Sequence, residues 1–97
     1  MRLGAVLTVF NEERNLRPCL ESLRGFDELI VVDSGSSDAT RAIAESYGAL
    51  VLQFPDIGNY DDRAYELIIA KQRYGVSQSK ADWILIIDAD ERFPVRS

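Results

Sequence analysis

Four short runs of large apolar residues recur along the chain, separated by polar, turn-rich or amphipathic segments. The runs are 3–10 (LGAVLTVF), 28–33 (ELIVVD), 49–54 (ALVLQF) and 83–88 (WILIID). Each run is short, nearly continuous and mostly rich in β-branched residues. That pattern is typical of a strand buried on both faces, as in a parallel sheet, so we predict four strands.

Helical spacing fills the segment after the first strand. Its apolar residues fall at the i, i+3, i+4 and i+7 interval of an amphipathic helix and are Leu16, Cys19, Leu20 and Leu23. Asn15 is the predicted cap, Pro18 is tolerated because it then falls in the first turn, and Gly25 ends the helix.

Two further helices are predicted after the second and third strands. Ser37 or Asp38 caps the second helix, and Gly48 is placed to terminate it. Residues 55–62 (PDIGNYDD) are turn-rich. A third helix then runs from Asp61 to Gln78, with Gly75 weakening it.

The alternation of strands and helices predicts the fold class. It indicates an α/β fold, a Rossmann-like three-layer α/β/α arrangement with a mainly parallel sheet of about four strands and right-handed crossovers. Because neither an internal repeat nor a linker divides the sequence, we expect residues 1–97 to form a single domain.

Composition narrows the class of function. The chain is 46% apolar and 28% charged, as in soluble globular proteins, and no apolar run approaches the roughly 20 residues of a membrane helix. The start, MRLGAVLTVFNEE, has no cleavage site typical of a signal peptide, so we expect a cytoplasmic protein. The net charge of −5 argues against a nucleic-acid partner, and the absence of histidine removes the commonest general base.

Polar residues follow three of the predicted strands. In open parallel sheets, ligands bind beyond the carboxyl ends of the strands, so these residues are the candidates for a site. They are Thr8, Asn11 and Glu12 after the first strand, Asp33, Ser34, Gly35, Ser36 and Asp38 after the second, and Asp88, Asp90 and Glu91 after the fourth. Carboxylates that converge repel one another unless a cation lies among them, so we expect Mg²⁺ or Mn²⁺ holding a phosphate.

The DAD sequence supports a metal on geometry, because residues two apart in extended backbone point to the same side. Plainer interpretations stand beside it. Charged residues often end strands, and the SGSSD loop reads equally well as a turn and helix cap. Arg63, Lys71 and Arg73 form a solvated helix face unless one turns toward the acidic edge to meet phosphate. Trp83, Tyr47 and Cys19 are interpreted as core residues.

Three segments in this order resemble a known family: TVFNEERNL, ELIVVDSGSSDAT and AKQRYGVSQSKADWILIIDADERF. Over residues 3–93 the chain resembles the N-terminal, nucleotide-sugar-binding half of family 2 glycosyltransferases, which are inverting enzymes of the GT-A fold. It is most similar to the bacterial lipopolysaccharide-core glucosyltransferases. The resemblance implies a truncated GT-A fold and a role in cell-envelope polysaccharide biosynthesis.

The resemblance also implies roles for individual residues. The nucleotide-sugar contacts that it implies are Thr8, Phe10, Asn11, Glu12, Asp33, Ser34, Ser36, Arg73, Asp88 and Ala89. Within this set the resemblance places Arg73 near the diphosphate; outside the set, Asp38 supports the loop after Asp33. The DXD pair places the metal on Asp90, with Asp88 on the ribose or the metal. Ser34 and Tyr74 depart from the family, which often has aspartate and asparagine there.

The implied reaction is metal-dependent transfer from a nucleotide-diphosphate sugar, with a UDP-sugar the leading expectation, to a hydroxyl of a saccharide or lipid-linked acceptor. The catalytic base is expected beyond Ser97, so the chain alone should bind nucleotide weakly and transfer sugar poorly. A position at the inner face of the membrane and a homodimer through an exposed sheet edge are compatible with this picture. Two alternatives stay open: a receiver-like phosphotransfer domain, for which Asn11-Glu12-Glu13 is a partial match, and a non-enzymatic α/β interaction module.

Overall fold

A computed structural model describes residues 1–54 and 64–94 of the chain. The elements, in chain order, are β1 (Leu3–Val9), α1 (Glu13–Ser22), β2 (Glu28–Asp33), α2 (Thr40–Ser46), β3 (Leu50–Gln53), α3 (Ala64–Ser77) and β4 (Trp83–Ile86). The four strands form one sheet in the order β3-β2-β1-β4, and every adjacent pair is parallel. The predicted parallel sheet is therefore confirmed.

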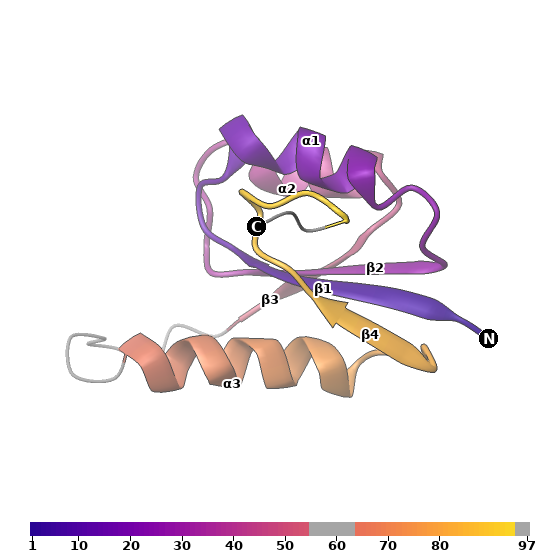
Figure 1. Cartoon of the computed structure of the whole chain (residues 1–97). Helices are drawn as coiled ribbons and strands as arrows, with labels where there is room; N and C mark the ends of the chain where they lie inside the picture. The colour runs from indigo at the N-terminus through magenta and orange to yellow at the C-terminus, as the bar shows by residue number, and fades with distance from the viewer. Residues whose placement is uncertain (55–63, 95–97) are drawn as a thin grey trace.

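The helices cover both faces of the sheet. In Figure 1, α1 and α2 lie side by side on one face and α3 crosses the other, where it contacts β1 and β2. This is the three-layer α/β/α arrangement that the alternation of elements predicted. All strands run the same way, so their carboxyl ends reach one edge of the molecule.

Apolar residues from the two central strands fill the core on both sides. Leu7 and Val31 face α1 and α2, where they join the buried Leu16, Cys19 and Leu20. Val6, Ile30 and Val32 face α3 and form a second, smaller cluster. Burial on both faces explains why β1 and β2 are nearly continuous apolar runs and show no alternation with polar residues.

The first helix begins earlier than its sequence indicates. It starts at Glu13, so Asn15 is not its cap, and Pro18 lies inside the helix and not in its first turn. Pro18 cannot donate the backbone bond expected of a helix interior, and its side chain is exposed. The early start follows from tertiary bonds to the residues before the helix, described below.

The end of the sheet at β4 also differs from expectation. Trp83 is 63% exposed, so its interpretation as a core residue was wrong: β4 is an edge strand and this side chain finds no covering element among the described residues. The predicted turn at 55–62, the helix start at Asp61 and Arg63 lie outside the described residues. None of the described helices has the length and apolarity that a bilayer crossing requires.

Candidate functional site

The loops that follow β1 and β2 are bonded to each other. The backbone N–H of Asn11 donates to Ser36 Oγ (2.8 Å), and the Asn11 side-chain oxygen accepts from the N–H of Ser37 (2.8 Å). Asn11 has a φ of 49°, in the left-handed region that asparagine tolerates better than most residues. The pair of bonds fixes the two strand ends as one unit.

A second set of bonds joins the start of α1 to the start of α2. Glu12 N–H donates to the buried Thr40 Oγ1 (2.8 Å), and Glu13 N–H donates to Asp38 Oδ2 (3.3 Å). The Thr40 hydroxyl also donates to Asp38, and this bond is the main cause of a lowered pKa at that carboxyl. These bonds satisfy N–H groups at the N-terminus of α1, which is why the helix can begin without the predicted cap. Sequence reasoning did not single out Thr40.

Asp33, at the end of β2, is fully buried and already bonded within its own loop. Its Oδ2 accepts from the N–H groups of Gly35 and Ser36 (3.0 Å each), and its Oδ1 accepts from the Ser36 hydroxyl. Gly35 takes a φ of 100°, which glycine adopts without strain. The Asp33 carboxylate therefore stabilises the loop after β2. These hydrogen bonds are a local reason for an acid at this strand end.

The DADE segment is a turn and not a continuation of β4. The strand ends at Ile86, and Glu91 N–H donates to the Asp88 carbonyl (2.9 Å) while Asp88 N–H donates to Glu91 Oε1 (2.9 Å). The strand geometry expected for the DAD sequence is therefore not observed. Asp88 and Asp90 are nevertheless both exposed, and Ala89 between them is buried, so the two carboxylates still reach solvent together.

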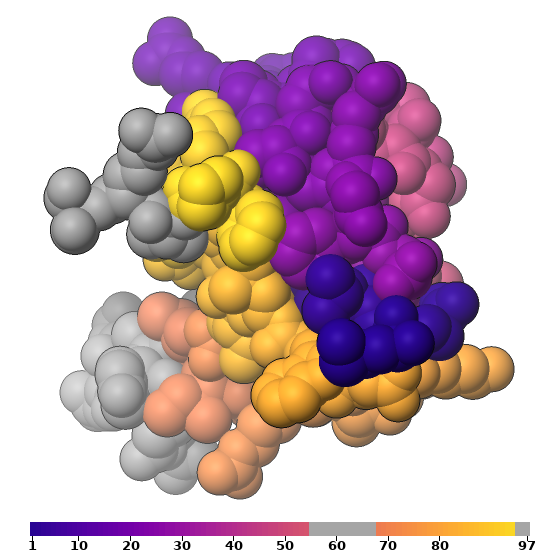
Figure 2. Space-filling model, turned by 45° about the vertical axis from the view of Figure 1, so that its right-hand side comes forward, coloured from indigo at the N-terminus to yellow at the C-terminus, as the bar shows by residue number. Residues whose placement is uncertain are grey.

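The segment after β4 folds back onto α1 and holds the turn in place. The Cys19 thiol, which lies on the buried face of α1, donates to the Asp88 carbonyl (3.6 Å). Phe93 N–H donates to Ser22 Oγ (3.0 Å), and its ring meets Phe26 edge to face at 5.1 Å. Figure 2 shows this yellow segment against the purple surface of α1. Burial raises the pKa of Cys19 to about 11, which agrees with the packing role predicted for it.

The acids of the turn could hold a cation without a third protein ligand. Burial raises the pKa of Asp88, and the neighbouring Glu91 and Asp90 raise it further because their charges disfavour another negative charge. Among the described residues there is no group of three or more acids, cysteines or histidines arranged to hold a metal. Asp88 and Asp90 fit the simpler pattern in which Mg²⁺ takes one or two carboxylates and completes its shell with water and phosphate.

Two hollows beside α3 divide several of the predicted site residues between them. Thr8, Phe10, Ser34 and Lys71 help line a hollow of about 140 Å³ at the ends of β1 and β2. Arg73 is exposed and lines a different hollow, of about 370 Å³, beside Ile86 at the β4 edge. The structure thus brings the predicted Thr8, Phe10 and Ser34 together and places Arg73 apart from them.

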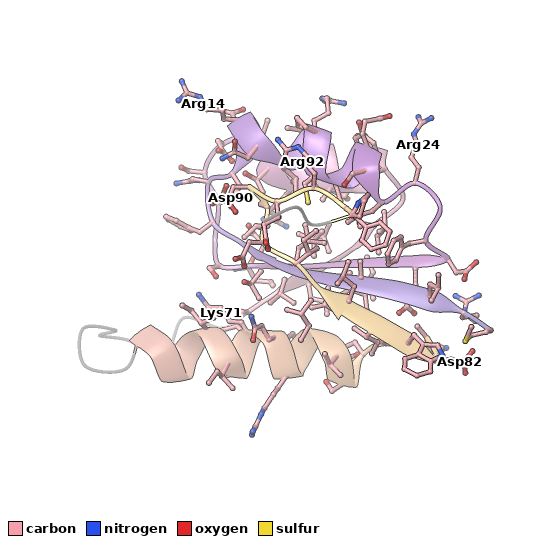
Figure 3. The ribbon with its side chains drawn as sticks, in the orientation of Figure 1. Arg14, Arg24, Lys71, Asp82, Asp90 and Arg92 are labelled. Atoms are coloured by element: carbon pink, nitrogen blue, oxygen red, sulfur yellow. The ribbon has the colours of Figure 1, made fainter. Side chains whose placement is uncertain are left out.

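Lys71 is the cation that turns toward the strand ends. Figure 3 shows its side chain between α3 and the sheet. Asp90 lies toward the same end of the molecule, and Asp82 lies at the other end. The sequence grouped Lys71 with a solvated helix face. Its spacing of three from the apolar Ile68 was the available signal in the sequence that the two residues share one side of the helix.

Comparison with known proteins identifies the family and the fold. The family model described as glycosyl transferase family 2 matches residues 5–96. A lipopolysaccharide core biosynthesis glycosyltransferase, LpsC of Rhizobium meliloti, is 36% identical over 91 residues, which cover 93% of this chain and 32% of LpsC. The chain therefore spans about a third of the length of this relative.

Solved structures show the same fold. TarS (residues 1–349) of S. aureus, crystallised with UDP, is 23% identical with a TM-score of 0.73, over 95% of this chain and 28% of TarS. Glucosyl-3-phosphoglycerate synthase of Mycobacterium tuberculosis, in complex with UDP, is 27% identical with a TM-score of 0.62, over 92% of this chain and 34% of the synthase. The predicted GT-A type of fold is confirmed, and the match over residues 5–96 shows that the chain belongs to glycosyl transferase family 2.

Proposed function

We propose that this chain is the nucleotide-sugar-binding domain of a glycosyltransferase that transfers a sugar, with inversion, from a UDP-sugar to an acceptor hydroxyl. The observation that carries the proposal is the anchored turn that exposes Asp88 and Asp90 at the edge where the bonded loops after β1 and β2 also lie. Family membership and the UDP complexes of TarS and the synthase support the choice of donor.

Asp90 and Asp88 are the residues that would hold a divalent cation, Mg²⁺ or Mn²⁺. The synthase has also been crystallised with Mn²⁺ together with UDP, at 24% identity to this chain. When bound, such an ion neutralises charge that develops on the leaving diphosphate. In this chain, the bond from Asp88 N–H to Glu91 and the contact between Cys19 and the Asp88 carbonyl keep the two carboxylates in position.

The loops after β1 and β2 would hold the nucleoside. Asp33 fixes the loop that presents Ser34 and Ser36, and Asn11 joins that loop to the end of β1. Thr8, Phe10 and Glu12 complete the proposed contact surface on the β1 side, Ala89 joins it from the β4 side, and Arg73 is proposed to reach the diphosphate from α3. Because these loops are cross-bonded before any ligand arrives, little ordering is needed on binding.

The acceptor is proposed to be a saccharide or a lipid-linked saccharide of the cell envelope, with the protein in the cytoplasm at the inner face of the membrane. The name of LpsC, which refers to lipopolysaccharide core biosynthesis, supports this choice. The acceptor groups and the general base are assigned to no described residue. They are proposed to belong to the part of the relatives' length that this chain does not match.

The metal role is tested by calorimetry of UDP binding with and without Mn²⁺, using Asp90→Asn. We expect Mn²⁺ to strengthen UDP binding to the wild-type chain, and Asp90→Asn to remove at least about tenfold of that gain, or about 1.4 kcal/mol. Glu45→Gln, which also removes one exposed negative charge but on α2, is the matched control and should behave as wild type. The proposal would be ruled out if Mn²⁺ did not change the affinity for UDP. It would also be ruled out if Mn²⁺ strengthened UDP binding equally in Asp90→Asn and in Glu45→Gln.

A further inference from the structure

The hollow at the ends of β1 and β2 is small, and among the described residues that line it one side chain is cationic. It has a volume of about 140 Å³ and is lined by Thr8, Val9, Phe10, Ser34, Ile68 and Lys71. Phe10 is 56% exposed, so its ring is available as a flat apolar surface there. The lining thus combines apolar surface with a hydroxyl and an ammonium group, which suits a flat, mostly neutral ligand with polar edges.

The helical repeat of α3 explains why Lys71 enters this hollow and Arg73 does not. Ile68, Lys71 and Gly75 follow one another at intervals of three and four, and Gly75 lies directly against Val6 of β1. Arg73 lies on the neighbouring stripe of α3 and points to the β4 edge. Lys71 and Arg73 therefore lie at different parts of the surface.

Phe54 links the surroundings of Lys71 to the end of β2. The Lys71 Nζ lies 5.9 Å from the centre of the Phe54 ring, and Phe54 is fixed by its N–H, which donates to the Asp33 carbonyl (2.9 Å). Partial burial lowers the pKa of Lys71, while the Asp33 charge raises it. Lys71 therefore lies among aromatic and hydroxyl-bearing neighbours at the strand ends.

We propose that Lys71 binds the nucleoside of the donor, with its ammonium donating a hydrogen bond to a carbonyl oxygen of the base. The inference rests on the proposed function and adds a residue to it. The lining supports it: a hollow with an exposed aromatic ring, hydroxyl groups and an ammonium group suits the base, and the exposed acids Asp88 and Asp90, on the other side of β1, suit a metal and the diphosphate. A charge-assisted bond of this kind contributes more than a neutral one.

The test compares Lys71→Met with Lys80→Met for binding of UDP by calorimetry and of uridine by NMR titration. Lys80 is an exposed lysine of the loop before β4 and serves as the matched control. We expect Lys71→Met to weaken both ligands by about tenfold, with or without Mn²⁺, while Lys80→Met changes neither. Lys71→Arg should recover part of the loss. In the wild-type chain with isotope-labelled lysine, uridine should shift the Lys71 side-chain signal and leave that of Lys80 unchanged.

The outcomes separate this inference from the proposed function. If the wild-type chain binds UDP and Lys71→Met binds it equally well, the inference fails and the proposed function stands. If Lys71→Met weakened the binding of UDP but not of uridine, Lys71 would contact the phosphates, and the inference would be overturned. If the wild-type chain binds no UDP at all, both proposals fall. The lysine-labelled wild-type measurement decides the matter even if Lys71→Met does not fold.

Discussion

At the end of β2, a buried carboxylate shows how a single residue shapes the candidate site. Asp33 has no solvent exposure, and its oxygens accept from two backbone N–H groups and one hydroxyl of the loop that follows. An acid at this position reads from the sequence as a ligand for a cation. Its bonds show that it first acts as the internal brace of the SGSSD loop, which in turn positions Ser34 and Ser36.

Replacing Asp33 by alanine is expected to destabilise the whole chain. The N–H groups of Gly35 and Ser36 would lose their charged acceptor in a partly buried place, at a cost of about 2–4 kcal/mol. Urea denaturation followed by circular dichroism measures the loss. Asp27→Ala removes an acceptor from one exposed N–H, that of Leu3, and should cost clearly less. Equal losses in the two variants would mean that the Asp33 loop is not the brace described here.

Among the elements, α3 depends on a glycine for its distance from the sheet. Gly75 sits where the helix crosses β1 and β2, and an added Cβ would lie 2.6 Å from Val6 Cγ1 and 3.0 Å from Val32 Cγ2. The sequence suggested only that Gly75 weakens the helix. The packing gives the compensating reason: without a side chain there, α3 approaches the sheet closely enough for Lys71 to reach the strand ends.

Gly75→Ala is expected to destabilise the chain, although alanine favours helices. The gain in helix propensity is about 1 kcal/mol, whereas overpacking a tight core costs about 1–3 kcal/mol, so the net loss should be about 1 kcal/mol. Thermal denaturation gives the comparison. Gly25→Ala is the control, because nothing lies within 4 Å of the added carbon there. A Gly75→Ala chain more stable than wild type would contradict the close approach of α3 to the sheet.

For the molecule as a whole, the β4 edge is the surface most open to association. The sheet order leaves β3 and β4 at its edges, and β4 exposes Trp83 (63%) and Ile86 (46%). An edge strand with exposed apolar side chains favours pairing with another strand.

We expect the 97-residue chain to self-associate through this edge as its concentration rises. Ile86→Lys places a charge on the edge and should shift the population toward monomer in sedimentation velocity. Leu50→Lys makes the same change at an equally exposed position on β3, the opposite edge, and should leave the association as in wild type. A wild-type chain that stays monomeric at every concentration, or a stronger effect of Leu50→Lys, would show that β4 is not the contact.

Much of the fold was readable from local patterns because those patterns report burial directly. The β2 bounds, 28–33, were predicted to the residue, and Gly48, with a φ of 77°, does end α2 as expected. The start of α1 was not predicted, because it depends on bonds that the N–H groups of Glu12 and Glu13 donate to Thr40 and Asp38, which are distant in sequence. The exposure of Trp83 was missed for a similar reason: periodicity marks a strand but does not say whether it lies at an edge.

The sequence alone determined that strands and helices alternate, that the sheet is parallel, and that acids follow β2 and β4, because a strand's hydrophobic run and its terminating residues are local properties. Only the tertiary structure decided which of those acids are internal braces and which face solvent, and which cation of α3 turns toward the strand ends. The physical reason is that hydrogen-bond partners and close packing join residues far apart in the chain, as Asn11 joins Ser36 and Gly75 meets Val6.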